Sequence, residues 1–256
     1  MTRLHKTVAS RMERAVQDYR MIQPGERILV GVSGGPDSLS LLKLLSEGLV
    51  HAPRYSVLAC HVDLGFEEPE PRGRRTLETH FQSLAVPYRI VRTSIARNAL
   101  DGNATKNPCF ICSMFRRKEI YRVADEEGCR TIAYGHHQDD VVETLLINIL
   151  YGRRIGTMHP VQEVFQGHLR IIRPFVYVEE NLLKRFASAS ALPVLPRCCP
   201  MDGQTRRQRV KELIRTLQRQ EPRADIRRNI FRSLYHVSVD FPPPPAEPPP
   251  DQLDAE

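Results

Sequence analysis

The chain has 256 residues, with 37 Lys and Arg against 30 Asp and Glu, and a formal net charge of +7. This length favours one domain with appendages, and the positive charge favours a polyanionic partner, with nucleic acid as the first candidate. Because no run of about eighteen apolar residues and no signal peptide occur, we expect a soluble cytoplasmic protein with no membrane partner.

The N-terminal residues predict a short amphipathic helix. Apolar side chains recur at a spacing of four between positions 3 and 20, at Leu4, Val8, Met12 and Val16. Pro24 and Gly25 then separate this helix from a buried strand over 26–32. We therefore expect an N-terminal helical segment over residues 1–22.

Residues 29–45 predict a strand, a glycine turn and a helix, and the rest of the chain is organised around them. Two glycines allow a tight turn that exposes backbone amides, and the N-terminus of the new helix favours an anion at the same place. Two serine hydroxyls add donors, and an aspartate is placed to hold Mg²⁺ beside a phosphate. The candidate ligands of this ATP site are Ser33, Gly34, Gly35, Asp37 and Ser38.

The turn is not a Walker loop, because no GxxxxGK[ST] pattern and hence no phosphate-binding lysine occurs in it. Its sequence, SGGPDS, resembles the SGGxDS signature of the N-type ATP pyrophosphatases, the PP-loop superfamily. This resemblance implies that ATP is cleaved between its α- and β-phosphates to adenylate a substrate.

Strands and helices alternate along the next part of the chain. Strands are predicted over 55–62, 88–93, 131–135 and 169–175, and helices over 37–48, 72–85, 114–127, 139–151 and 179–190. The alternation predicts an α/β fold with a parallel sheet, of the adenine nucleotide alpha hydrolase type, and flanking helices. In such sheets ligands bind beyond the carboxyl ends of the strands, where the functional motifs fall.

Two of these motifs follow the second and fourth strands. The resemblance implies that Val62 and Asp63 contact the nucleotide. In the block GHHQDDVVET, Gly135 comes after the strand, His136 and His137 could contact pyrophosphate or orient the target base, and two acids begin the next helix, where they can share Mg²⁺. This block is similar to one in TtcA and lysidine synthetase sequences. The candidate catalytic residues are Asp37, His137, Asp139 and Asp140.

The cysteines suggest a metal site. Cys109 and Cys112 form a CxxC at a helix start, and Cys198 and Cys199 form a second pair, whereas Cys60 and Cys129 are expected to be packing residues. Two adjacent cysteines rarely bind one zinc ion with good geometry, so one of them and the CxxC make three thiolates. That set leaves a four-iron cluster with one open iron, or a zinc ion with one open position.

From the N-terminus to about Asp240 the chain resembles the TtcA family, the tRNA 2-thiocytidine synthetases, through SGGPDS, CFICSMFRR, GHHQDDVVETLLINILYG, IIRPFVYV and LPVLPRCCP. The resemblance implies a 4Fe-4S cluster held by Cys109, Cys112 and a later cysteine. The family usually has Pro-Cys-x-x-Cys where this chain has Pro-Arg-Cys-Cys. Counting from Pro196 points one place beyond Cys199, so Cys199 is preferred as the third ligand, with Cys198 as the alternative.

A basic region between 204 and 232 predicts an RNA-binding helix. Ten Lys or Arg side chains surround apolar positions at helical spacing, which gives one apolar face and one basic face. Such a face binds the phosphate backbone of tRNA without reading its sequence. The candidate RNA-binding residues are Arg116, Arg117, Arg206, Arg207 and Arg209.

Four segments follow from these patterns: the N-terminal helix over 1–22, a PP-loop ATP pyrophosphatase domain with the CxxC insertion over 23–200, basic helices over 201–240 and a Pro-rich tail over 241–256. The tail contains seven prolines and four acids, so we expect it to be disordered.

The leading hypothesis is ATP-dependent tRNA thiolation, in which C2 of an anticodon-loop cytidine is adenylated and its oxygen is replaced by sulfur. The cofactors are then ATP, Mg²⁺ and a 4Fe-4S cluster, the partners are tRNA and a cysteine desulfurase that supplies sulfur, and a homodimer is possible because relatives are often dimeric. The alternatives are a lysidine-synthetase-like tRNA ligase, a cluster-dependent thiolase or desulfurase with another substrate, and a zinc-stabilised RNA-binding module.

Overall fold

A computed structural model describes residues 2–66, 73–100, 107–196, 198–201, 203 and 205–238. Its central sheet has six strands in the order β3-β2-β1-β4-β6-β5. The strands are β1 (Arg27–Gly31), β2 (Ser56–Asp63), β3 (Tyr88–Arg92), β4 (Thr131–Ala133), β5 (Val161–Val164) and β6 (Leu169–Ile172). All neighbours pair in parallel except β5, which runs antiparallel to β6 at the edge.

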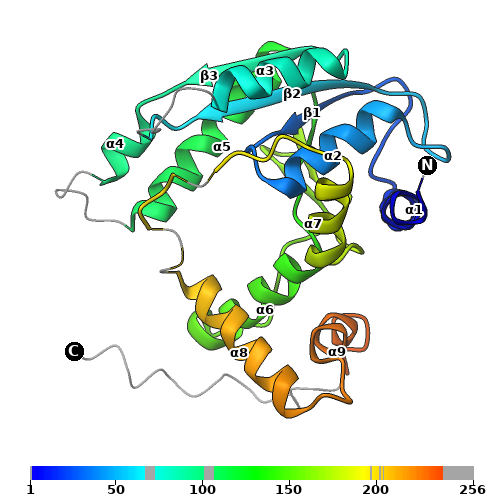
Figure 1. Cartoon of the computed structure of the whole chain (residues 1–256), viewed down its shortest axis with the longest axis vertical. Helices are drawn as coiled ribbons and strands as arrows, with labels where there is room; N and C mark the ends of the chain where they lie inside the picture. Colours follow the sequence, from blue (N-terminus) through cyan, green and yellow to red (C-terminus); the bar gives the residue numbers. More distant parts are fainter. Residues whose placement is uncertain are drawn as a thin grey trace.

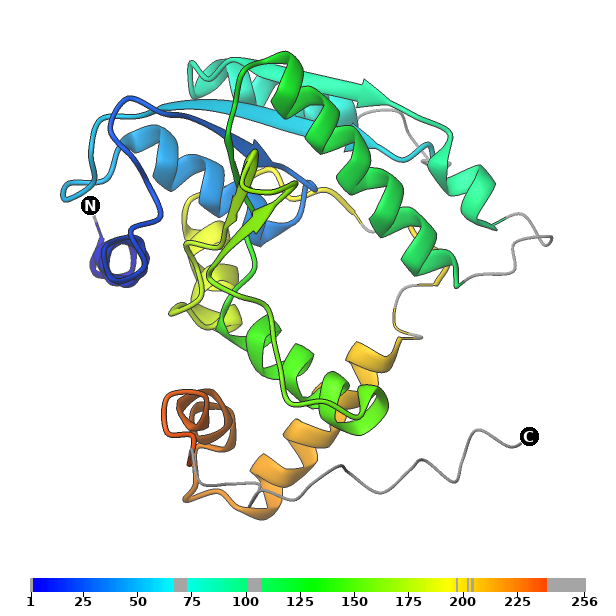
Figure 2. The same cartoon turned by 180° about the vertical axis from the view of Figure 1, so that it is seen from behind.

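Helices cover both faces of this sheet (Figures 1 and 2). They are α1 (Arg3–Asp18), α2 (Pro36–Glu47), α3 (Gly73–Ser83), α4 (Ile95–Leu100), α5 (Pro108–Glu126), α6 (Gln138–Gly152), α7 (Glu180–Ala189), α8 (Arg206–Gln220) and α9 (Ile226–Ser233). Ile28 and Val30 of β1 belong to the core shared with α2, α3 and α7, whereas Leu29 belongs to the core under α4 and α5. The alternation of side chains along a strand thus produces two apolar layers.

The C-terminal helices α8 and α9 pack against α6, at the end of the molecule away from β3 (Figure 1). Val210 and Ile214 of α8 and Phe231 of α9 are buried there. The segment after α7 runs past the start of α2 toward the N-terminal end of α5 before it enters α8 (Figures 1 and 2). Three distant stretches of the chain therefore meet at the carboxyl edge of the sheet.

The predicted parallel α/β fold is confirmed, and several element bounds differ. The helix predicted over 114–127 begins at Pro108, so the CxxC opens this helix as expected. The Asn107 side chain caps it by accepting a hydrogen bond from the amide of Cys109. The edge strand β5 and the short helix α4 were not predicted. The strand predicted over 169–175 ends at Ile172, two residues before Pro174.

The predicted tail over 241–256 lies outside the described residues. Within the described part of the chain, no helix is long and apolar enough to cross a membrane.

Candidate active site

The glycine turn between β1 and α2 is held by its own serines. The Ser38 hydroxyl accepts a hydrogen bond from the Ser33 amide at 3.1 Å and lies 3.1 Å from the Ser33 hydroxyl. The Gly35 amide donates to the Ser33 hydroxyl at 3.3 Å. Gly34 has a φ of +85°, which disfavours any residue with a side chain. The turn thus presents backbone amides and hydroxyls at the start of α2, as anion binding requires.

Two other segments pack directly on this turn. A Cβ atom at Gly135 would lie 2.9 Å from the carbonyl carbon of Asp37 and 3.0 Å from the amide nitrogen of Ser38, so the residue after β4 must lack a side chain. On the other side, the amide of Leu195 donates to the Gly34 carbonyl at 2.9 Å. The turn is therefore clamped between the end of β4 and the segment that follows α7.

A cavity of about 530 Å³ opens beside the turn and collects most of the predicted site residues. The predicted residues in its wall are Ser33, Asp37, Ser38, Val62, Gly135, His136, Asp140, Arg116, Arg117 and Arg207. Side chains with no assigned role complete it, chiefly Tyr134 and Arg173. Gly34 and Gly35 belong to the turn itself, and Asp63 accepts a hydrogen bond from the Gly65 amide just beyond β2.

Asp37 is the carboxylate nearest to the turn. Its Oδ1 atom is buried without a hydrogen-bond partner among the described residues, and its Oδ2 atom lies 3.9 Å from Nε2 of His137. Burial raises the pKa of Asp37, His137 opposes this effect, and the negative charge of Asp140 adds to it. Such an unsatisfied oxygen beside a second carboxylate suits a Mg²⁺ ion, which takes oxygen ligands.

His137, Asp139 and Asp140 are tied into the start of α6. The Asp140 amide donates to Nδ1 of His137 at 3.3 Å, and the His137 amide donates to Oδ2 of Asp140 at 3.1 Å, which forms a capping box. Asp139 accepts from the Glu180 amide at 2.8 Å and pairs with Arg227 at 2.5 Å. Only Asp140 of the three also lines the cavity, so His137 and Asp139 are placed to position it.

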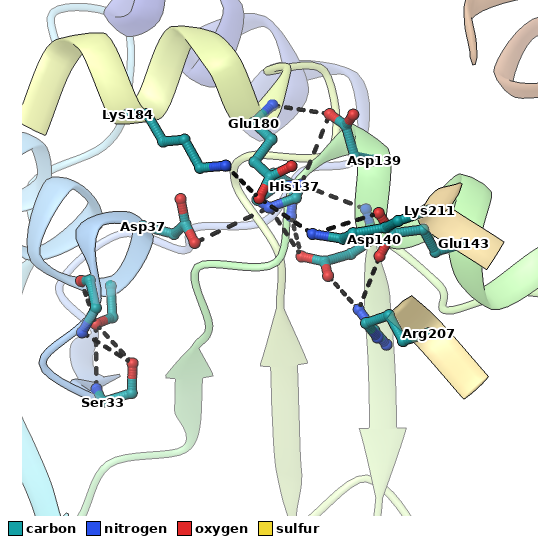
Figure 3. Close-up of polar contacts among 12 residues, drawn as sticks. Ser33, Asp37, His137, Asp139, Asp140, Glu143, Glu180, Lys184, Arg207 and Lys211 are labelled. Carbon is teal, nitrogen blue, oxygen red and sulfur yellow. Dashed lines mark hydrogen bonds and ion pairs between the residues drawn. The ribbon is translucent and has the colours of Figure 1, made fainter. Parts of the chain in front are cut away.

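A charged cluster joins α6 to the C-terminal helices (Figure 3). At its centre is Glu143, which is fully buried. Its carboxylate lies 3.6 Å from Arg207, 3.6 Å from Lys211 and 3.9 Å from Arg227. Burial raises the pKa of Glu143 to about 7, against the effect of Lys211 and Arg207. Sequence reasoning missed this residue, although an acid among the apolar residues that follow Asp140 in the helix predicted over 139–151 was an available signal.

The cysteines of the CxxC lie within the first five residues of α5, just before the residues of that helix that line the cavity. Cys109 and Cys199 both act electrostatically on Cys112, and burial raises the pKa of the Cys112 thiol. The Cys198 thiol instead donates to the Pro196 carbonyl at 3.7 Å. Within the described residues, no three His, Cys, Asp or Glu side chains are close enough to hold a single metal ion.

Arg116 connects these thiols to the cavity. It lines the cavity, and burial lowers its pKa while the neighbouring Cys112 and Cys199 oppose that effect. Arg173, which directly follows β6, is buried and donates to the His159 carbonyl and to Gln162. One wall of the cavity is thus cationic, and this wall reaches the cysteine-bearing helix.

Comparison with known proteins identifies the family. A sequence profile of the PP-loop domain matches residues 4–216. A tRNA-cytidine(32) 2-sulfurtransferase of Alkalilimnicola ehrlichii is 37% identical over 243 residues, which cover 91% of this chain and 74% of that protein. The corresponding enzyme of Syntrophotalea carbinolica is 36% identical over 92% of this chain and 90% of that protein. The chain belongs to the tRNA-cytidine(32) 2-sulfurtransferase (TtcA) family.

The solved structures agree with this assignment. The U34-tRNA thiolase NcsA from Methanococcus maripaludis, solved with its [4Fe-4S] cluster, superposes with a TM-score of 0.71 at 25% identity, over 92% of this chain and 80% of that one. As a TtcA-family sulfurtransferase, the chain has the PP-loop fold that the turn at Gly34 predicted. Its relatives are sulfurtransferases, so the comparisons support neither the lysidine-synthetase-like ligase nor the zinc-stabilised RNA-binding module.

Proposed function

We propose that this sulfurtransferase replaces the C2 oxygen of a cytidine in the tRNA anticodon loop, position 32 in its relatives, by sulfur at the expense of ATP. The observation that carries the proposal is the continuity of the site. One cavity has the phosphate turn in one wall and Ser113, Arg116 and Arg117 of the cysteine-bearing helix in another. A base bound between these walls would lie between the nucleotide and the helix that carries Cys109 and Cys112.

The chemistry needs activation, because a carbonyl oxygen is a poor leaving group. The C2 oxygen of cytidine attacks the α-phosphorus of ATP, the bond between the α- and β-phosphates breaks, and pyrophosphate leaves. Sulfide then adds to C2, and AMP departs with the former oxygen. In this scheme Ser33, Gly34, Gly35 and Ser38 hold the phosphates, and Asp37 and Asp140 hold Mg²⁺. Val62 and Asp63 lie where strand β2 ends and contact the nucleoside.

The thiols fit an iron–sulfur cluster. A four-iron cluster spreads its ligands further apart than a single ion does, and three thiols approach from two elements. We assign Cys109, Cys112 and Cys199 as the ligands, because the Cys198 thiol is directed to the backbone carbonyl of Pro196. A cluster with three protein ligands supplies an open iron that can carry sulfide, which a cysteine desulfurase would deliver.

The exposed cations of α8 complete the proposal as tRNA contacts. Arg206 and Arg209 are exposed in the first turn of that helix, and the Arg206 guanidinium lies 5.0 Å from the ring centre of Tyr151. Two arginines on one exposed face can contact the RNA backbone without reading its sequence. Arg116 and Arg117 lie inside the cavity, where they would meet the target nucleotide.

The test is thiolation by anaerobically reconstituted protein with tRNA, MgATP and sulfide, with modified nucleosides identified by mass spectrometry. We expect 2-thiocytidine from the unchanged protein, no product from Cys199→Ala, and product from the matched variant Cys198→Ala. Absence of any thiolated nucleoside from the unchanged protein, with cluster and tRNA both present, would overturn the function. If Cys198→Ala loses the product and Cys199→Ala keeps it, the third ligand is Cys198 instead of Cys199.

A further inference from the structure

The phosphate turn lacks the lysine with which many nucleotide-binding loops grip the terminal phosphates. A triphosphate carries up to four negative charges, and one Mg²⁺ ion balances only two of them, so a cationic side chain in the cavity can stabilise the rest. Among the described residues, the cations that line the cavity are Arg116, Arg117, Arg173 and Arg207.

Three of these four are placed for other tasks. Arg173 is buried, and it donates to the carbonyl of His159 and to Gln162. Arg116 is beside Cys112, and Arg117 is the next residue of the same helix and donates to the Ser113 carbonyl. The α5 pair thus borders the thiols rather than Asp37.

Arg207 stands on the opposite side, next to the carboxylates of the metal site. Its Nη1 atom pairs with Oδ1 of Asp140 and lies 3.6 Å from Oε2 of Glu143 (Figure 3). Asp140 in turn acts electrostatically on Asp37, at the phosphate turn. Arg207 therefore belongs to the end of the cavity where the phosphates and Mg²⁺ would lie.

We propose that Arg207 binds the β- and γ-phosphates of ATP and then the released pyrophosphate, instead of the RNA backbone. The inference rests on the proposed use of the cavity for ATP. Both contacts of the guanidinium run through Nη1, and within the described part of the chain Nη2 and Nε have no hydrogen-bond partner. A planar guanidinium oriented by two carboxylates can offer these donors to a phosphate.

This role makes α8 part of the nucleotide site. Arg207 lies in the first turn of that helix, eight residues after Cys199, and Lys211 one turn later also pairs with Glu143. Lys184 on α7 is a rival cation, because it acts on Asp37. However, its Nζ atom pairs with Glu180 at 2.9 Å, and it does not line the cavity.

The test is calorimetric titration of the full chain with MgATP, Mg-pyrophosphate and AMP. For Arg207→Gln we expect MgATP and pyrophosphate to bind about 10–100-fold more weakly, since a hydrogen bond to a charged group contributes about 1.5–3 kcal/mol. AMP, which lacks the β- and γ-phosphates, should bind within about twofold of the unchanged protein. Arg215→Gln, an exposed position on the same helix, is the matched control and should change none of the three.

Two results would overturn the proposal. One is an equal loss for AMP and MgATP, which marks a structural role; the other is unchanged MgATP binding with weakened tRNA binding, which marks an RNA contact. Arg207→Lys keeps the charge and guards against loss of folding, and it should retain part of the affinity for pyrophosphate. If all nucleotide results are as expected but no tRNA is thiolated, the proposed function fails while Arg207 keeps its phosphate role.

Discussion

Glu143 makes the stability of this protein depend on pH in an unusual direction. Burial raises its pKa to about 7 in the folded state, whereas an unfolded glutamate has a pKa near 4.5. The folded state therefore binds this proton more tightly than the unfolded state does. The stability that the protonated Glu143 contributes is fully present below about pH 4.5 and is lost as pH rises through about 7. As pH rises from 5 to 8, we expect the free energy of unfolding of Glu143→Gln to increase relative to that of the unchanged protein by about 2–3 kcal/mol. Urea unfolding at several pH values measures this difference, and a difference independent of pH would contradict it.

Substitution of Gly135 tests whether the close packing of the chain after β4 holds the phosphate turn in place. Alanine at this position would bring a Cβ atom within 3.0 Å of the backbone of Asp37 and Ser38, so α2 must shift. An overpacked contact costs about 1–3 kcal/mol, and we expect MgATP affinity to fall about 10–100-fold. Gly156→Ala is the control, since no atom lies within 4 Å of its added Cβ. Equal MgATP affinity of both variants, measured by calorimetry, would show that the turn does not depend on this approach.

Among single residues, the sequence predicted those whose roles depend only on neighbouring positions in the chain. The serines and glycines of the turn, and Asp37, follow from a short motif in a strand–turn–helix context. Glu143 was missed because its partners Arg207, Lys211 and Arg227 come from distant segments. Arg207 was assigned to the solvated face of α8, since helical spacing shows which residues share a face but does not show that α6 offers carboxylates to it.

An ion pair with a buried carboxylate connects α9 to the start of α6. Arg227 pairs with Asp139, which is 6% exposed and also accepts from the Glu180 amide. Arg227→Gln leaves this carboxylate buried without its cation, and we expect a loss of about 3–5 kcal/mol in the free energy of unfolding. The neighbouring Arg228 is exposed, so Arg228→Gln should change it by less than about 0.5 kcal/mol. Urea unfolding of both variants measures these free energies, and equal values for the two variants would refute a structural role for the Arg227–Asp139 pair.

Long elements with a strong apolar pattern were predicted well, and short or polar ones were not. The strand β5 has only four residues, VQEV, and none of them is buried, so no alternation marks it. The CxxC was expected at a helix start, but the apolar pattern marked this helix only from 114, because the first turn of α5 exposes Cys109 and Phe110 and has no apolar face. Its cap, Asn107, is a feature of local geometry that a pattern of apolar residues does not contain.

The protein has a net charge of +7, and the cations of α8 lie in two different places. The sheet and its flanking helices form the nucleotide site, whereas α8 presents a cation to the cavity and others to solvent. One helix thereby connects the two substrates of the proposed reaction. Its buried face is fixed by Val210 and Ile214 against α6, so its arginines are held in a defined place relative to the phosphate turn.

The salt dependence of tRNA binding tests this division of labour. Each phosphate contact adds about one to the slope of log affinity against log salt concentration. We expect the double variant Arg206→Gln, Arg209→Gln to lower that slope by about two and to leave MgATP affinity unchanged, because neither residue lines the cavity. The control is Arg3→Gln, Arg14→Gln, which removes the same charge from exposed positions of α1. If both double variants lower the slope equally, the basic face of α8 has no special contact with the RNA, and only the net charge attracts it.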